Sequence, residues 1–352
     1  MRALLIREHV PLAPLTTLGV GGPARYFAEV RSEAEVVEAI GFATSRQLSL
    51  FVLGGGSNVL VADSGFPGLV LKVAVAGVSH STSPDGHVVF TAGAGVEWDA
   101  LVGQTVEANC AGLECLSGIP GTVGGTPVQN VGAYGQEVSE TMREVRALDL
   151  RTLKVQTLCN ADCRFSYRSS IFNTSARDRY VILQVSFALR EGAPPTIGYA
   201  DLQNFFEATE GAPTLAELRA AVREIRHRKA MLIVPGDDDA RSAGSFFKNP
   251  VVLQSFFEQL SARLHSRGLQ PPSYPAGDGF RKLPAAWLVE HAGFAKGYTK
   301  GAAGISRKHA LAIINRGGAT AAEIIALKNE IQARVQDEFG IGLMPEPVFV
   351  GF

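Results

Sequence analysis

Two glycine-rich segments interrupt the first half of the chain. Gly54, Gly55 and Gly56 come directly after Leu48–Leu53, an apolar run that predicts a buried strand. The second segment, Ser117–Gly135, holds too many glycines and small polar residues to pack as a helix or a strand. A tight turn and a surface loop are the ordinary explanations for such segments. However, long loops without secondary structure are uncommon unless they bind or catalyse, so the pair predicts one extended, phosphate-bearing cofactor.

The first glycine segment lacks the dinucleotide-binding pattern G-x-G-x-x-G, because Val59 stands where the third glycine is required. It can still cradle a phosphate. Residues without Cβ let consecutive backbone N–H groups converge on an anion, and the Ser57 hydroxyl and Asn58 amide add donors. The segment therefore excludes the Rossmann fingerprint and leaves a phosphate cradle and a plain turn as alternatives.

Capping signals and apolar runs predict a mixture of helices and strands. Capping boxes predict helices that begin after Ser32, Thr214 and Thr320, the last of them ending at Gly340. Apolar and β-branched runs predict strands at 68–78, 87–98, 144–150, 152–158, 179–189 and 343–350. Polar residues with proline and glycine predict a loop over 233–243, near the start of a last domain.

The composition bounds the class of protein. The 352 residues suffice for two or three domains at roughly 150 residues each, and the 46% of apolar residues excludes a disordered chain. Lys and Arg number 33 against 34 Asp and Glu, so no basic excess favours nucleic acid or an anionic membrane. We find no signal peptide and no apolar run of roughly 18 residues, and expect a cytoplasmic protein. The cysteines lack C-x-x-C spacing and are expected to be reduced thiols: Cys110, Cys115, Cys159 and Cys163.

Five motifs, in this order, resemble the UDP-N-acetylenolpyruvoylglucosamine reductase family, flavoenzymes of peptidoglycan precursor synthesis. They are LGGGSNVLVAD at 53–63, GIPGTVGGTPVQNVGAYGQE at 118–137, FSYRSSIF at 165–172, AGSFFKNPVV at 243–252 and MPEPVFVGF at 344–352. The resemblance implies an α+β fold in which two subdomains of the vanillyl-alcohol-oxidase (PCMH) type hold FAD and a C-terminal α+β domain binds substrate. In this chain these would be residues 1–75, residues 76–230 with a tyrosine loop, and residues 231–352, whose final strand returns to the active site.

The resemblance also implies which residues hold FAD. The pyrophosphate would be bound through the backbone donors of Gly54, Gly55, Gly56, Ser57 and Asn58. The same channel would be lined by Gly121, Gly124, Gly125, Thr126 and Arg168. Some relatives of the wider fold attach FAD through His or Cys. Because His9 is the only histidine before His80, we expect non-covalent FAD, with Cys110 and Cys115 as the alternative attachment points.

The reaction that the resemblance implies is a reduction in two half-reactions. NADPH reduces the flavin, and reduced FAD passes a hydride to the vinyl carbon of UDP-N-acetylglucosamine enolpyruvate, which becomes UDP-N-acetylmuramate. Hydride addition leaves negative charge beside the substrate carboxylate, so the site needs a cation and a proton donor. By resemblance Arg168 is the catalytic cation, Ser245 protonates the intermediate, and Glu346 stabilises the enol or polarises the acid. Taken alone, each would be an ordinary surface, cap or edge residue.

Four further positions match substrate contacts of the family. Tyr199 in IGYADL would close over the substrate diphosphate. Lys229 would pair with the same diphosphate, although a basic helix end is also what the helix dipole favours. Asn249 would bind the uracil or another polar group. His309 stands where some members have a glutamine that contacts substrate, so it is either a substitute donor or a structural residue at a helix start.

Two other functions stay open at this point. One is an oxidase of hydroxy acids or lactones with the same fold, which would use oxygen in place of NADPH and would have no need of Arg168, Ser245 and Glu346. The other is a non-catalytic protein that binds a UDP-sugar. We expect no metal site, no nucleic-acid partner and no membrane insertion, and nothing in the sequence requires more than a monomer.

Overall fold

The computed structural model describes residues 4–209 and 211–352, which divide into two compact units. Unit 1 consists of the chain through Pro11, Pro23–Gly56 and Phe66–Leu232. Unit 2 consists of Leu12–Gly22, Ser57–Gly65 and Ile233–Phe352. Two short early segments therefore fold with the C-terminal part of the chain. The division into three parts at residues 75 and 230 stays a prediction.

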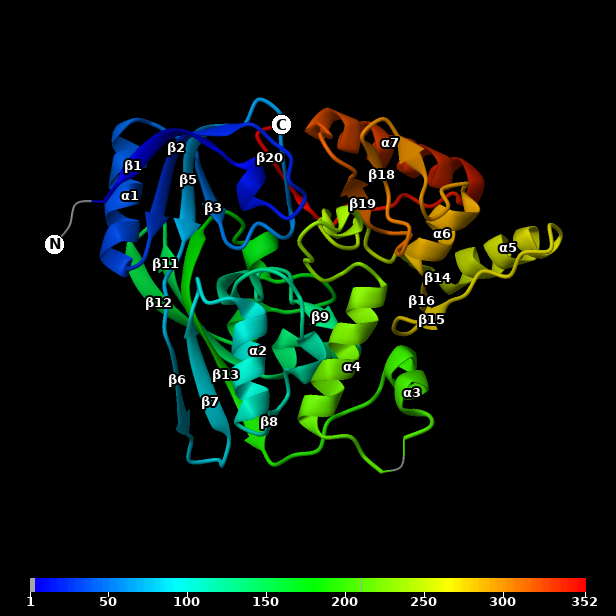
Figure 1. Cartoon of the computed structure of the whole chain (residues 1–352), viewed down its shortest axis with the longest axis horizontal. Coiled ribbons are helices and arrows are strands. Elements are labelled where there is room, and N and C mark those ends of the chain that lie inside the picture. Colours follow the sequence, from blue (N-terminus) through cyan, green and yellow to red (C-terminus); the bar gives the residue numbers. More distant parts are fainter. Residues whose placement is uncertain (1–3, 210) are drawn as a thin grey trace. The chain divides into compact units, whose positions relative to one another are not determined.

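The first sheet of unit 1 has the strand order β1-β2-β5-β3, in which β5 runs parallel to both β2 and β3. Helix α1 packs on β2 and β5, as Figure 1 shows. The Ser32 side chain accepts a hydrogen bond from the Glu35 N–H, so the predicted cap does begin this helix. The elements are β1 (Ile6–Pro11), β2 (Pro23–Val30), α1 (Glu33–Ser45), β3 (Leu50–Leu53) and β5 (Phe66–Val73).

The second sheet of unit 1 is antiparallel, with the strand order β12-β11-β13-β7-β6, and β8 also pairs with β13. The buried Trp98 at the start of α2 packs edge-on against Phe187 of β13, and its indole N–H donates to the Leu116 carbonyl at 3.0 Å. The elements are β6 (Val78–Thr82), β7 (Val88–Gly93), α2 (Trp98–Glu107), β8 (Cys110–Ala111), β9 (Gly132–Ala133), β10 (Gln136–Glu137), β11 (Met142–Asp149), β12 (Lys154–Cys159), β13 (Tyr180–Glu191), α3 (Ala200–Phe206) and α4 (Leu215–Arg228).

Unit 2 packs three helices and three small sheets around its own apolar core. Asp63 accepts hydrogen bonds from the Ala321 and Ala322 N–H groups and so fixes the early segment Ser57–Gly65 to the start of α7. The elements are β4 (Val59–Val61), β14 (Val251–Leu253), α5 (Gln254–His265), β15 (Tyr274–Pro275), β16 (Phe280–Lys282), α6 (Ala285–His291), β17 (Thr299–Lys300), β18 (Ala303–Ile305), β19 (Ile313–Asn315), α7 (Ala321–Phe339) and β20 (Val348–Val350). Among the described residues, no helix has both the length and the apolar character needed to cross a membrane.

Several predicted elements are shorter in the structure. The strand expected over 343–350 is only β20, because Pro345 and Pro347 have no N–H to donate to a partner strand. Strand β7 ends at Gly93, and the following Trp98 begins a helix rather than ending a strand. The helix that begins after Thr214 ends at Arg228, and shortly afterwards Ala230 takes the left-handed backbone conformation with φ of 51°.

Candidate active site

The two glycine-rich segments lie against each other in unit 1. A Cβ placed on Gly55 would lie 2.5 Å from the Gly121 Cα, which is closer than real Cβ atoms approach a backbone atom. A Cβ on Gly54 would lie 3.0 Å from the Thr122 Oγ1. Gly121 itself has φ of 124°, which only glycine adopts readily. The close approach of two backbones therefore explains why glycine stands at position 55.

The same region has room and a polar group for another molecule. The Thr122 hydroxyl is buried and finds no hydrogen-bond partner within the described residues. Gly125 is exposed, and a Cβ on it would meet no described atom within 4 Å beyond its chain neighbours. The unpaired Thr122 hydroxyl and the open space beside the exposed Gly125 fit a phosphate-bearing cofactor such as FAD. Thr122 was not among the residues that the sequence singled out, although it lies within the second glycine segment.

Three of the residues predicted to line the cofactor channel use their backbone N–H groups within the fold. Gly124 donates to the Ala94 carbonyl, while Gly125 and Thr126 close the short turn Val123–Gly125. The Thr126 hydroxyl also donates to the Val123 carbonyl at 2.8 Å. These residues therefore offer a cofactor no free backbone donor, and of the three only Gly125 has open space beside it.

Ser57 and Asn58, the other end of the first glycine segment, belong to unit 2. The Asn58 side-chain amide donates to the Glu346 carbonyl at 3.3 Å, and the Asn58 carbonyl accepts from the Val348 N–H at 2.9 Å. The Ser57 carbonyl accepts from the Thr17 hydroxyl at 3.4 Å. Asn58 thus helps to hold the segment that carries Glu346, a contact between residues almost three hundred positions apart.

Arg168 lies in unit 1, and its side chain contacts the second glycine segment. Its Nη2 donates to the Gly132 carbonyl at 2.6 Å, and its Nη1 lies 3.5 Å from the Asn130 carbonyl. Its backbone has φ of 52°, and the Asn173 side chain donates to its carbonyl at 3.2 Å. The structure therefore places the predicted catalytic cation against the loop that is predicted to line the cofactor channel.

Ser245 and Glu346 lie in unit 2, on segments whose backbones are hydrogen-bonded to each other. The Glu346 N–H donates to the Phe246 carbonyl at 2.9 Å, and the Phe246 N–H donates to the Leu311 carbonyl at 2.8 Å. The half-buried Ser245 hydroxyl lies 3.0 Å from the Nε2 atom of His309. Three of the predicted site residues thus lie on adjoining segments of one unit.

The remaining predicted substrate contact of unit 2 is Asn249. Its Oδ1 accepts the Ala285 N–H at 2.9 Å and so satisfies a backbone donor at the start of α6. A role of Asn249 toward substrate stays a prediction.

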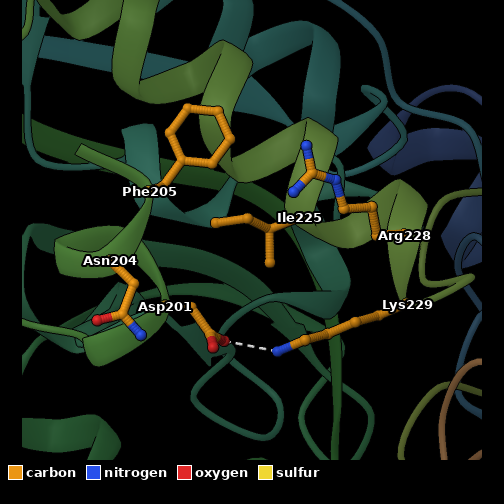
Figure 2. Close-up of a pocket in the computed structure, with 6 residues that line it drawn as sticks. All are labelled: Asp201, Asn204, Phe205, Ile225, Arg228 and Lys229. Atoms are coloured by element: carbon orange, nitrogen blue, oxygen red, sulfur yellow. Dashed lines mark hydrogen bonds and ion pairs between the residues drawn. The ribbon is translucent and has the colours of Figure 1, made fainter. Parts of the chain in front are cut away.

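Lys229 and Tyr199 flank helix α3 in unit 1. Lys229 Nζ donates to Asp201 Oδ2 at 2.5 Å, and Figure 2 shows this ion pair at a pocket of about 270 Å³. The pocket is lined by Asp201, Asn204, Phe205, Ile225, Arg228 and Lys229. Tyr199 is half exposed, directly precedes α3, and packs edge-on against Tyr134 with 5.6 Å between ring centroids. An anion that reached Lys229 would therefore compete with Asp201.

Tyr134 and Arg226 are two buried polar residues near α3 and α4. Neither was predicted from the sequence to belong to the site. Burial raises the pKa of the Tyr134 hydroxyl to about 12, which keeps it protonated at neutral pH. Arg226 is only 4% exposed and donates to the Met231 carbonyl at 2.8 Å. A signal for Arg226 exists in the sequence, because it follows Val222 by four positions and so shares the apolar face of α4.

The cysteines favour a non-covalent cofactor. Cys110, Cys115 and Cys163 are buried free thiols, and Cys159 is exposed. Burial raises the pKa of Cys115 to about 12, and a protonated thiol is a poor nucleophile. Across residues 4–209 and 211–352 no three His, Cys, Asp or Glu side chains gather as a metal site would require.

Comparison with known proteins gives the same assignment to both parts of the chain. Residues 24–155 match the family described as an FAD binding domain, and residues 236–350 match the C-terminal domain of UDP-N-acetylenolpyruvoylglucosamine reductase. The reductase of Thermobifida fusca (strain YX) is 46% identical over 349 residues, covering 98% of each chain. The chain belongs to the UDP-N-acetylenolpyruvoylglucosamine reductase family.

Further comparisons extend over nearly the whole molecule. The reductase of Mycobacterium tuberculosis (strain ATCC 25177 / H37Ra) is 44% identical over 358 residues, covering 98% of this chain and 95% of its own. The crystal structure of the Thermus caldophilus reductase superposes with a TM-score of 0.66 at 25% identity, covering 99% of this chain and all of that one. The predicted family and the predicted α+β fold with an FAD-binding part are therefore confirmed. The chain is an FAD-dependent oxidoreductase.

Proposed function

We propose that this reductase converts UDP-N-acetylglucosamine enolpyruvate to UDP-N-acetylmuramate in peptidoglycan precursor synthesis, with NADPH as the hydride donor. The match to the reductase family over almost the entire chain supports the substrate. The observation that carries the chemistry is the Ser245 hydroxyl, which lies 3.0 Å from a ring nitrogen and beside the backbone pairing of Phe246 with Glu346. A hydroxyl held in this way suits the delivery of one proton to a defined carbon atom.

The cofactor would be held by the glycine segments. Gly54, Gly55 and Gly56 would admit its pyrophosphate, the Thr122 hydroxyl would supply a donor, and Gly125 would leave space. Bound FAD supplies the hydride that this chain's own side chains cannot supply. NADPH as the source of that hydride follows from the family, and a cytoplasmic monomer is part of the same proposal.

The side chains would act on the substrate at separate atoms. Arg168, fixed on the Asn130 and Gly132 carbonyls, would bind the substrate carboxylate and stabilise the charge that develops on it. Ser245 would protonate the adjacent carbon, and Glu346 would stabilise the enol form or polarise the acid. Tyr199 and Lys229 would bind the diphosphate, and Asn249 would contribute a polar contact.

Ser245→Ala tests this proposal through the two half-reactions, followed separately by flavin absorbance under anaerobic conditions. We expect NADPH-driven bleaching at close to the wild-type rate, because the hydroxyl takes no part in it. Recolouring by the enolpyruvyl sugar should slow by roughly 10²- to 10⁴-fold, the usual contribution of a general acid. Equal loss of both half-reactions would show that Ser245 is structural and would overturn its assignment as the proton donor.

A further inference from the structure

In unit 2 the Ser245 hydroxyl lies within reach of a histidine side chain. Its Oγ lies 3.0 Å from His309 Nε2, within hydrogen-bond distance, although the two residues are 64 positions apart in the sequence. The His309 side chain is half buried, as is that of Ser245. The family resemblance offered His309 as a substitute for a glutamine that contacts substrate, whereas the geometry gives it a contact with the proposed acid itself.

The backbone around His309 is fixed from two sides. The fully buried Asp239 accepts hydrogen bonds from both the N–H and the Nε of Arg307, each at 2.8 Å. Lys308 Nζ pairs with Asp237 at 2.8 Å. On the other side, the Leu311 carbonyl accepts the Phe246 N–H at 2.8 Å, one residue after Ser245. The backbone segments that carry the imidazole and the hydroxyl are therefore fixed next to each other by the fold.

The charged side chains near His309, on segments 237–241 and 307–308, form ion pairs of opposite charge. Asp237 and Asp239 are matched by Lys308 and Arg307, and Asp238 pairs with Arg241 at 2.6 Å. Lys248 lies on the same segment as Phe246, and Glu346 lies on a segment whose backbone is hydrogen-bonded to it. Proton gain or loss at His309 would thus change the charge beside Ser245 itself.

A serine hydroxyl is a weak acid, and giving its proton to carbon would leave an alkoxide. That alkoxide needs a proton from a second donor within hydrogen-bond reach. Histidine is the side chain that changes protonation near neutral pH, and its ring nitrogen already lies at that distance.

We propose that His309 is the positioning residue and proton relay of Ser245, an inference that rests on the proposed function. His309 in its imidazolium form donates Nε2–H to Ser245 Oγ, which turns the serine proton toward the substrate carbon. The Ser245 O–H bond breaks as the substrate C–H bond forms. The Nε2–H bond then breaks as the Ser245 O–H bond re-forms, leaving neutral imidazole that takes up one hydronium-derived proton from the bulk solvent.

The test compares His309→Ala and His309→Gln with Ser245→Ala in the anaerobic substrate half-reaction. We expect recolouring to slow by roughly 10²-fold in His309→Ala. Because His309 acts only through Ser245, the double variant Ser245→Ala/His309→Ala should be no slower than Ser245→Ala alone. His309→Gln keeps a donor but cannot release a proton, so its recolouring rate should be less impaired than that of His309→Ala. It should also lose the fall with rising pH that we expect of the wild type.

Two further measurements separate this role from a structural one. His291→Gln, which changes an exposed histidine of α6 in the same unit, is the matched control and should recolour at close to the wild-type rate. In the protein without substrate, the side-chain nitrogen resonances of His309 should shift in Ser245→Ala, while those of the exposed His291 should not.

Each result has a distinct meaning. If Ser245→Ala slows recolouring and His309→Ala does not, the relay is wrong and the proposed function stands. If the two single losses simply add in the double variant, or if the pH dependence survives in His309→Gln, His309 does not act through Ser245. If Ser245→Ala has no effect, the proposed proton donor itself is wrong.

Discussion

Gly55 and Gly125 belong to the same glycine-rich region, but the structure requires them for different reasons. A Cβ on Gly55 would lie 2.5 Å from the Gly121 Cα, so any side chain there must push two backbones apart. A Cβ on Gly125 would meet no described atom within 4 Å beyond its neighbours. Glycine at position 55 is therefore needed by the protein, whereas at position 125 only a bound molecule would need it.

Alanine at these two positions should consequently give different results. Gly125→Ala should leave the stability of the FAD-free protein within about 0.5 kcal/mol of wild type, because it disturbs no packed atom. It should nevertheless weaken FAD binding, measured by titration of the FAD-free protein with the cofactor. Gly55→Ala should lower both the unfolding temperature of the FAD-free protein and its FAD content. Normal FAD binding by Gly125→Ala would remove Gly125 from the cofactor site.

The chemistry-bearing residues were predictable only as single positions. Arg168, Ser245 and Glu346 could be proposed because their motifs resemble a family, but the contact of Ser245 with His309 joins residues 64 positions apart. No spacing rule connects two loops at that separation. The role of the Thr122 hydroxyl likewise could not be predicted from the sequence, since its lack of a hydrogen-bond partner in the described residues follows only from the tertiary packing.

The turn between β11 and β12 is held by one buried carboxylate. Asp149 accepts Arg179 Nη2 at 2.7 Å and Nε at 3.1 Å, and its other oxygen accepts the Arg151 N–H at 2.9 Å. The hydrogen bond from Arg179 holds the pKa of Asp149 below its usual value. A carboxyl whose pKa is lowered by folding stabilises the fold above the pKa it has when unfolded, about 3.9, and loses that effect as the pH falls through its folded pKa.

Asp149→Asn should therefore destabilise the protein in a pH-dependent manner. The variant should unfold at lower urea concentration than wild type at pH 7, because asparagine cannot offer Arg179 a charged acceptor. Below about pH 4 the difference between the two midpoints should narrow as the wild-type carboxyl becomes protonated. The control is Asp178→Asn, whose exposed ion pair with Arg177 should contribute little at either pH. A difference that stays constant with pH would contradict the role of the Asp149 charge.

Local signals predicted where helices start better than where strands end. The capping boxes at Thr214 and Thr320 both form, and Gly340 ends α7 with φ of 72°. Strand ends depend on partner strands, which the local sequence does not show. The run at 343–350 was predicted as one strand, yet it divides between two partners: Val348–Val350 pairs with β4, and Pro345 forms a single bridge with Phe247. The predicted run 87–98 likewise contains the whole of β7 and the first residue of α2.

At the scale of the whole molecule, the division into two units does not follow chain order. Leu12–Gly22 and Ser57–Gly65 fold with the C-terminal part of the chain. Val59–Val61 pairs with Val348–Val350 in parallel, and Asn315 Nδ2 donates to the Leu18 and Gly19 carbonyls. Such pairings join the two ends of the chain, and neither hydrophobic period nor turn chemistry encodes them. The fold class could be predicted from the sequence because the family resemblance extends over the same long range.

The anaerobic visible spectrum of the purified protein, recorded as NADPH and then UDP-N-acetylglucosamine enolpyruvate are added, tests the proposed reaction as a whole. We predict a flavin spectrum that bleaches with NADPH and recovers when the enolpyruvyl sugar is added without oxygen. Bleaching that is reversed only by oxygen would indicate an oxidase. A protein that gains no flavin spectrum even after incubation with FAD would contradict the assignment of the glycine segments to this cofactor.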